Sequence, residues 1–168
     1  MPFYQIEHCF PLQKAQRDEL AQAITTIHTR KFATPSLFVN VRFTDSSQQY
    51  NYVAGKECAI NRIVAYVRAG PTRSKADFDN VAVQILEAWN RIINPRNERH
   101  TERELKRVFV MGAITTGLES GFLLPPAGQD AAWLKDNTPR FQELAEQGNP
   151  EFVELMNEIQ SRGDLSVA

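Results

Sequence analysis

The order of its periodic segments constrains this chain more than any other feature. Residues 2–9 form an apolar-rich run typical of a strand, and a helical stretch ending near Arg30 follows it. The next run, SLFVNVRFT at residues 36–44, alternates between apolar and polar side chains, with Leu37, Val39, Val41 and Phe43 on one side. Such alternation predicts a half-buried strand. The first part of the chain therefore predicts a strand, a helix and a second strand.

The second part of the chain repeats this order. AINRIVAYVRAG at residues 59–70 is typical of a strand, and LKRVFVMGAI at residues 105–114 is typical of another. Between them, Ser74 to Asn94 predicts a helix with an apolar stripe, formed by Phe78, Val81, Ile85, Trp89 and Ile92. We therefore expect an α+β fold in which two β-α-β units form one sheet with the helices on one face.

The remaining segments indicate connections and a helical end. DSSQQYNYVAGK at residues 45–56 predicts a turn with a short hairpin arm, and GLESGFLLPPAG at residues 117–128 is too rich in Gly and Pro for a regular element. Helical stretches are expected at residues 138–147 and 150–162. We interpret residues 1–128 as the main domain and residues 129–168 as a C-terminal helical extension that packs on it.

Charge and motif content exclude several classes of function. The 19 basic and 20 acidic side chains nearly cancel, and no basic run suggests a nucleic-acid surface. Cys9 and Cys58 are far apart, and the P-loop, GxGxxG and GxSxG motifs are absent, as is a histidine pair at metal-ligand spacing. No signal-peptide pattern or membrane-length apolar stretch is present. We expect a cytoplasmic protein that uses no metal or cofactor and binds neither nucleic acid nor membranes.

Pro2 is the first candidate for chemistry. If Met1 is removed, the nitrogen of Pro2 becomes a terminal secondary amine, and α-amino groups titrate near pH 7.7–8.0. Hydrophobic surroundings or nearby cations lower the pKa of such an amine and give a base, whereas a nearby carboxylate raises it and gives an acid. The alternative is an incidental proline at the start of a strand.

Other polar residues also have two interpretations each. His28 lies at the end of the first predicted helix, where it either caps the last carbonyls or points towards Pro2. Arg68 and Arg73 flank the turn AGPT, where they either grip a carboxylate or are merely solvated. Glu119 lies in the irregular loop, where most glutamates are simply exposed.

Taken together, these residues carry a family resemblance. The stretches AITTIHTR, VNVRF, VRAGPTRSKAD and LESGFLLPPAG follow one another behind the proline. In this order and spacing, residues 2–128 resemble the tautomerase superfamily, and within it the cis-3-chloroacrylic acid dehalogenase group. The resemblance implies a tautomerase-like domain with the fold shared by macrophage migration inhibitory factor. It also implies a homotrimer with sites near subunit boundaries.

The resemblance also implies roles for residues. Pro2 would exchange a proton with a substrate carbon, and Glu119 would orient or deprotonate water. Three residues, His28, Arg68 and Arg73, would bind the carboxylate of a small substrate. Tyr4 and Thr34 match polar positions of the group and are expected to bind substrate as well.

Several functions remain open. The dehalogenase group has a tyrosine in the strand before the glutamate loop, where this chain offers Phe109, Val110 and Met111. We therefore favour a tautomerase over a hydratase or a cis-3-haloacrylate dehalogenase, with a small unsaturated or 2-oxo carboxylic acid as substrate. A non-catalytic binding protein on the same scaffold is the other alternative. A malonate semialdehyde decarboxylase is disfavoured, because Asn40 stands where such enzymes have an aspartate.

Overall fold

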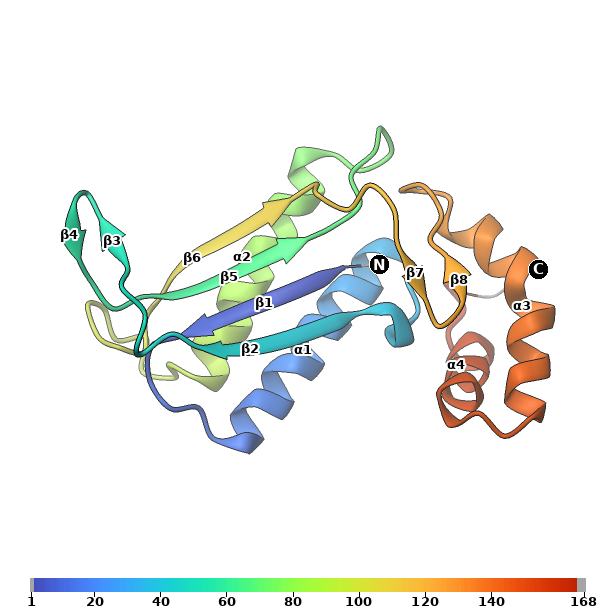
Figure 1. The fold of residues 1–168 in the computed structure, drawn as a ribbon, viewed down its shortest axis with the longest axis horizontal. Coiled ribbons are helices and arrows are strands. Elements are labelled where there is room, and N and C mark those ends of the chain that lie inside the picture. Colours follow the sequence, from blue (N-terminus) through green and yellow to red (C-terminus); the bar gives the residue numbers. More distant parts are fainter. Residues whose placement is uncertain (1, 166–168) are drawn as a thin grey trace.

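A four-stranded sheet with two long helices on one face forms the larger part of the fold (Figure 1). In this computed structural model, which describes residues 2–165, the strand order is β2-β1-β5-β6. β1 (Phe3–His8) pairs in parallel with β2 (Asn40–Asp45), and β5 (Asn61–Tyr66) pairs in parallel with β6 (Leu105–Met111). The two pairs join through the antiparallel contact between β1 and β5.

One helix connects each parallel pair. α1 (Lys14–Phe32) links β1 to β2, and α2 (Lys75–Ile92) links β5 to β6. Ser74 caps α2, because its hydroxyl accepts from the backbone N–H of Asp77 while the Asp77 carboxylate accepts from the N–H of Ser74. The structure confirms the predicted α+β fold of two β-α-β units with helices on one face.

The main core lies between the sheet and these helices. Tyr4 and Ile6 of β1 point into it and are fully buried, as is Trp89 of α2. Because strand side chains alternate, the intervening residues lie on the other face. That face has no helix over it in Figure 1, and it leaves Phe109 and Met111 of β6 47% and 46% exposed.

The segment at residues 36–44 differs from the prediction of one continuous strand. Ser36–Phe38 form a 3₁₀ turn, η1, directly after Pro35, and the strand starts only at Asn40. Phe38 is buried in a second apolar cluster, away from the sheet. Leu37 packs on the same cluster, so it does not share a strand face with Val41 as the alternation suggested.

Two short hairpins lie between the main elements. β3 (Tyr52–Val53) pairs with β4 (Lys56–Glu57), which matches the predicted arm. The region at residues 117–128 is more regular than expected, because β7 (Leu118–Glu119) pairs with β8 (Phe122–Leu123). The turn between them, at residues 120–121, has positive φ at both positions, which suits a tight hairpin.

Two helices complete the described chain. α3 (Asp130–Glu146) begins earlier than the expected residue 138 and continues through Pro139, and α4 (Pro150–Ser161) agrees with the prediction. Both pack in the second cluster, which also takes in η1 and the β7-β8 hairpin and comprises Phe38, Leu134, Phe141, Phe152, Leu155, Ile159 and Leu165 with partly buried neighbours. The domain division after residue 128 stays a prediction. Within residues 2–165, no helix is long and apolar enough to cross a bilayer.

Candidate functional site

Pro2 and Glu119 come together through Asn40. The parallel pairing of β1 with β2 places the Asn40 backbone N–H 3.1 Å from the carbonyl oxygen of Pro2, to which it donates. The Asn40 side-chain Nδ2 donates to Oε1 of Glu119, on β7, also at 3.1 Å. Pro2 is buried, and Glu119 is half-buried. Burial raises the pKa of the Glu119 carboxyl above its usual value, an effect that the nearby Arg68 charge opposes.

A buried pair, Tyr4 and His28, joins β1 to the end of α1. The Tyr4 hydroxyl and Nδ1 of His28 are 2.8 Å apart, and the two residues are 0% and 2% exposed. Burial, with a further contribution from the Arg73 charge, lowers the pKa of His28 to about 3. Burial also raises the pKa of the Tyr4 hydroxyl. Both side chains are therefore neutral near pH 7.

Arg68 and Arg73 share one carboxylate, that of Asp130 at the start of α3. Nη2 of Arg68 forms a short hydrogen bond with Asp130, and Nη2 of Arg73 donates to Oδ2 of Asp130 at 2.8 Å. Nη1 of Arg68 donates to the carbonyls of Pro125 and Pro126. The three charged side chains are only 5%, 6% and 8% exposed. The carboxylate that the arginines bind in this structure belongs to the chain itself, and binding of a substrate carboxylate stays a prediction.

Phe32 connects the arginines to the histidine. The Arg73 guanidinium lies over the Phe32 ring, 4.5 Å from its centroid, and the Phe32 and His28 ring centroids are 4.8 Å apart. The Arg73 charge lowers the pKa of His28, and the Arg68 charge contributes to the pKa of both His28 and Glu119. The ion pair, the buried Tyr-His pair and the carboxyl of β7 therefore occupy one region.

The structure thus gathers most of the predicted site residues, namely Pro2, Tyr4, His28, Arg68, Arg73 and Glu119. Thr34 is different. Its hydroxyl donates to the carbonyl of Phe32 at 3.4 Å, and its own carbonyl accepts from Nη1 of Arg162 at 3.2 Å. These contacts close the end of α1 and tie it to α4. Among residues 2–165 we find no hydrogen bond from Thr34 to another predicted site residue. Met1, whose removal is expected, lies outside the described residues.

Sequence reasoning missed two members of this region. Asn40 was noted only for the aspartate that it replaces, although a polar residue beside Pro2 on the next strand was the available signal. Asp130 gave no signal of its own, because it lies 57 positions beyond Arg73 and in the extension. Its contact with the arginines follows from the tertiary fold, which brings the start of α3 to the turn after β5.

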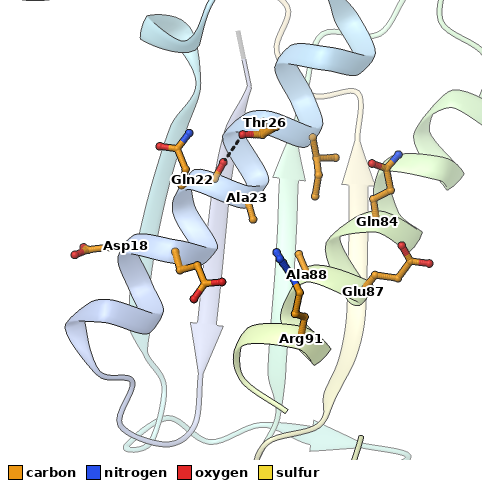
Figure 2. Close-up of a pocket in the computed structure, with 10 residues that line it drawn as sticks. Asp18, Gln22, Ala23, Thr26, Gln84, Glu87, Ala88 and Arg91 are labelled. Atoms are coloured by element: carbon orange, nitrogen blue, oxygen red, sulfur yellow. Dashed lines mark hydrogen bonds between the residues drawn. The ribbon is translucent and has the colours of Figure 1, made fainter. Parts of the chain in front are cut away.

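The groove in Figure 2 lies elsewhere. It runs over the outer sides of α1 and α2 with a volume of about 860 Å³, and no predicted site residue lines it; its labelled residues are Asp18, Gln22, Ala23, Thr26, Gln84, Glu87, Ala88 and Arg91. The described part of the chain contains no cluster of three or more His, Cys, Asp or Glu side chains that could hold a metal ion. The gathered residues can instead bind an anion, donate hydrogen bonds from neutral groups and, at a free Pro2 amine, transfer a proton.

Similar structures share this fold. The chain has 23% identity and a TM-score of 0.63 with N1, a member of the cis-3-chloroacrylic acid dehalogenase (cis-CaaD) family, over 85% of this chain and 98% of that one. With Leishmania major MIF2 the sequence identity is 16% and the TM-score is 0.56, over 74% of this chain and 97% of that one. With Q0 fused 4-OT, a wild-type symmetric trimer, the sequence identity is 14% and the TM-score is 0.56, over 71% of this chain and 94% of that one. No curated protein sequence gives a significant match.

A family model gives a match at the level of sequence. The Tautomerase_3 model, described as "Putative oxalocrotonate tautomerase enzyme", matches residues 1–138. The match spans both β-α-β units, the β7-β8 hairpin and the first turns of α3. The resemblance to the tautomerase superfamily is confirmed, and the chain belongs to the Tautomerase_3 family of that superfamily.

Proposed function

We propose that the protein is a cofactor-independent tautomerase that uses an amino-terminal proline on a small unsaturated or 2-oxo carboxylic acid. A hydratase or a cis-3-haloacrylate dehalogenase is the related alternative. The family model that matches the chain is described as "Putative oxalocrotonate tautomerase enzyme", which supports the proposal at the level of class. We expect the protein to act in the cytoplasm, as the sequence suggests.

The arrangement of Pro2, Asn40 and Glu119 is the observation that carries the proposal. Asn40 binds the Pro2 carbonyl with its backbone and Glu119 with its side chain. A carboxyl near a terminal amine favours the charged amine, which is a proton donor, whereas burial favours the neutral base. With Met1 removed, Pro2 would therefore have both forms within reach near neutral pH, as a tautomerase needs when it takes a proton from one atom and returns it to another.

The Tyr4-His28 pair supplies a neutral hydrogen-bond donor. In the proposed site the Tyr4 hydroxyl donates to Nδ1 of His28, so that the imidazole proton is on Nε2. A buried donor of this kind is already held in place, so it can stabilise a carboxylate or a developing oxyanion without reorganisation during the reaction. Arg68 and Arg73 would hold the substrate carboxylate by charge-assisted hydrogen bonds.

We propose a homotrimer for this chain. The uncovered sheet face carries exposed apolar side chains, Phe109 and Met111, next to the stacked rings of Phe3 and Tyr66. Apolar patches of this kind on a sheet indicate a protein interface. A measured mass in solution of about three times 19.1 kDa is expected.

Pro2→Ala and Arg73→Ala test the proposed site, after an intact mass has shown whether Met1 is absent. The assay follows ketonisation of the enol of a 2-oxo acid. Because general acid-base catalysis contributes about 10²–10⁴-fold, we expect Pro2→Ala to lower kcat/KM by at least about 100-fold. Pro11→Ala and Arg99→Ala, at exposed positions, serve as matched controls. Unchanged turnover in both site variants would refute the enzyme proposal.

Glu119→Gln separates the two catalytic modes. A tautomerase transfers protons at Pro2 itself, so its ketonisation activity should fall only as far as the missing carboxylate shifts the Pro2 amine towards its neutral form. A hydratase or dehalogenase needs the carboxylate to activate water, and its activity on a 3-haloacrylate would be lost. The variant retains the acceptor for Asn40, since the amide oxygen of Gln occupies the place of Oε1.

One observation favours a non-catalytic binding protein as the second candidate. The two arginines expected to bind substrate already have a carboxylate partner in Asp130. If Asp130 stays bound to both arginines, the chain has the residues of the site but does not bind an acid substrate there. Absence of turnover on a panel of enols and haloacrylates, with Met1 removed, would support this candidate.

A further inference from the structure

The ion pair between the arginines and the extension has the form of an occupied carboxylate site. Asp130 presents one carboxylate oxygen to Arg68 and the other to Arg73. A substrate carboxylate bound by the same arginines would make this pattern of contacts. Asp130 is therefore placed where the substrate carboxylate is expected.

We propose that Asp130 is a tethered competitor for the carboxylate of the substrate, and that the start of α3 must release Arg68 and Arg73 before an acid binds. This inference rests on the proposed function, because it assigns those arginines to an acid substrate. It adds that the extension controls which acids bind and how tightly. The substrate carboxylate and the carboxylate of Asp130 would bind the same two arginines, one at a time.

Burial of the arginine side chains, more than their hydrogen bonds, leaves little room for a simultaneous second anion, because a guanidinium has five N–H donors. Nη1 and Nη2 of Arg68 both donate to protein oxygens, and so do Nη1 and Nη2 of Arg73, whose Nη1 reaches the Arg68 carbonyl at 3.2 Å. The side chains are also almost completely covered. An incoming carboxylate that uses the same two Nη2 atoms must therefore replace Asp130.

The loop before α3 is seated closely on the turn that carries the arginines. At Gly128, whose φ is +86°, an added Cβ would lie 2.0 Å from Oγ1 and 2.9 Å from Cβ of Thr72. An added Cβ at Gly70 would lie 3.0 Å from Cβ of Ala127. At Gly128 only glycine combines this approach with the positive φ, and we infer that the loop at residues 125–129 holds Asp130 against the arginines.

Exchange of one carboxylate for another is physically reasonable here. Removing Asp130 alone would leave two buried cations without this partner, which is strongly unfavourable. When an acid enters as Asp130 leaves, the arginine charges stay compensated. The apparent Kd of the acid is then its intrinsic Kd divided by the fraction of molecules in which the arginines are released.

Propionate, with its neutral isostere propionamide as a control ligand, tests the proposal. Calorimetric titration compares the wild type, Asp130→Asn and the matched control Asp136→Asn, at an exposed position of the same helix. We expect Asp130→Asn to bind propionate with a Kd at least ten times lower than that of the wild type. Asp136→Asn should bind propionate like the wild type, and propionamide should show no such difference.

Equal or weaker propionate binding by folded Asp130→Asn would overturn the proposal, because Asp130 would then merely position the arginines. If this variant is poorly folded, its thermal unfolding with and without propionate gives the answer. The proposal expects propionate to raise its Tm more than that of the wild type, since a ligand that binds the native state stabilises it. Absence of this additional rise would also overturn it.

The result of the propionate-binding experiment does not depend on whether the protein is an enzyme. Propionate binding to the arginines does not need the Pro2 amine, so Asp130→Asn combined with Pro2→Ala should keep the tighter binding. Tighter binding without turnover in any Met1-free protein would refute only the proposed enzyme. Turnover with unchanged propionate binding would refute only the role of Asp130.

Discussion

Acidification from pH 7 to pH 5 is expected to destabilise the protein through one buried side chain, His28. Burial and the Arg73 charge lower its pKa in the folded state to about 3, whereas an unfolded histidine titrates near 6.5. Between pH 6.5 and about pH 3, His28 therefore binds a proton in the unfolded chain but not in the folded chain. The stability contributed by neutral His28 is complete above pH 6.5 and declines as the pH falls.

The magnitude follows from the size of this window. Each pH unit between the two pKa values changes the free energy of unfolding by about 1.36 kcal/mol per group. From pH 6.5 to pH 5 the loss is therefore about 2 kcal/mol. No discount for solvent applies, because His28 is only 2% exposed. For a chain of this length, such a loss lowers Tm by about 4–8 °C.

Urea unfolding at several pH values between 5 and 7.5 measures the effect in the wild type and His28→Asn. Asn retains an acceptor for the Tyr4 hydroxyl but does not titrate, so the variant should show a flatter dependence of unfolding free energy on pH. His100→Asn, at an exposed position, is the control and should behave like the wild type. The raised pKa of Glu119 favours the folded state as pH falls, and its contribution cancels between proteins that all contain it. Equal slopes for the wild type and His28→Asn would refute the reasoning.

Three further variants test other parts of the fold and site. Gly128→Ala places a Cβ against Thr72 and should loosen the loop, giving tighter propionate binding in calorimetry with no change of charge; unchanged binding would contradict the role of the loop. Asn40→Leu removes a hydrogen bond that lowers the pKa of Glu119, so that pKa should rise further in NMR titration, and a fall would contradict the assignment. Ser74→Ala removes an N-cap and should cost about 1 kcal/mol in urea unfolding, with no effect on propionate affinity.

Periodicity and apolar composition were sufficient to predict the main sheet and its two helices, because these elements bury most of their apolar side chains. Prediction was poorer where a segment serves the second cluster. Leu37 continues the alternation of the following strand and Phe38 interrupts it, yet both pack against helices about 100 residues later in the chain. The early start of α3 was missed, although the buried Leu134 and Phe141 lie two turns apart on one face of this helix, on either side of Pro139.

The site shows the same limit. Pro2, His28 and Glu119 were found because their order along the chain matches a family pattern. Asn40 and Asp130 have no pattern of their own, and their importance comes from partners distant in sequence, at 79 and 57 positions. Hydrogen-bond partners of this kind follow from the tertiary fold and not from local spacing.

The site divides into parts that should respond separately to perturbation. The Tyr4-His28 pair is held by β1 and α1 in the main core, and its neutrality follows from burial. The proposed anion site depends on α3, because Asp130 compensates the charges of Arg68 and Arg73. Displacement of Asp130 by an acid leaves the number of buried charges unchanged. Substrate exchange at the arginines therefore need not alter the protonation of His28, and affinity for acids can change through the extension while the proposed proton-transfer groups stay in place.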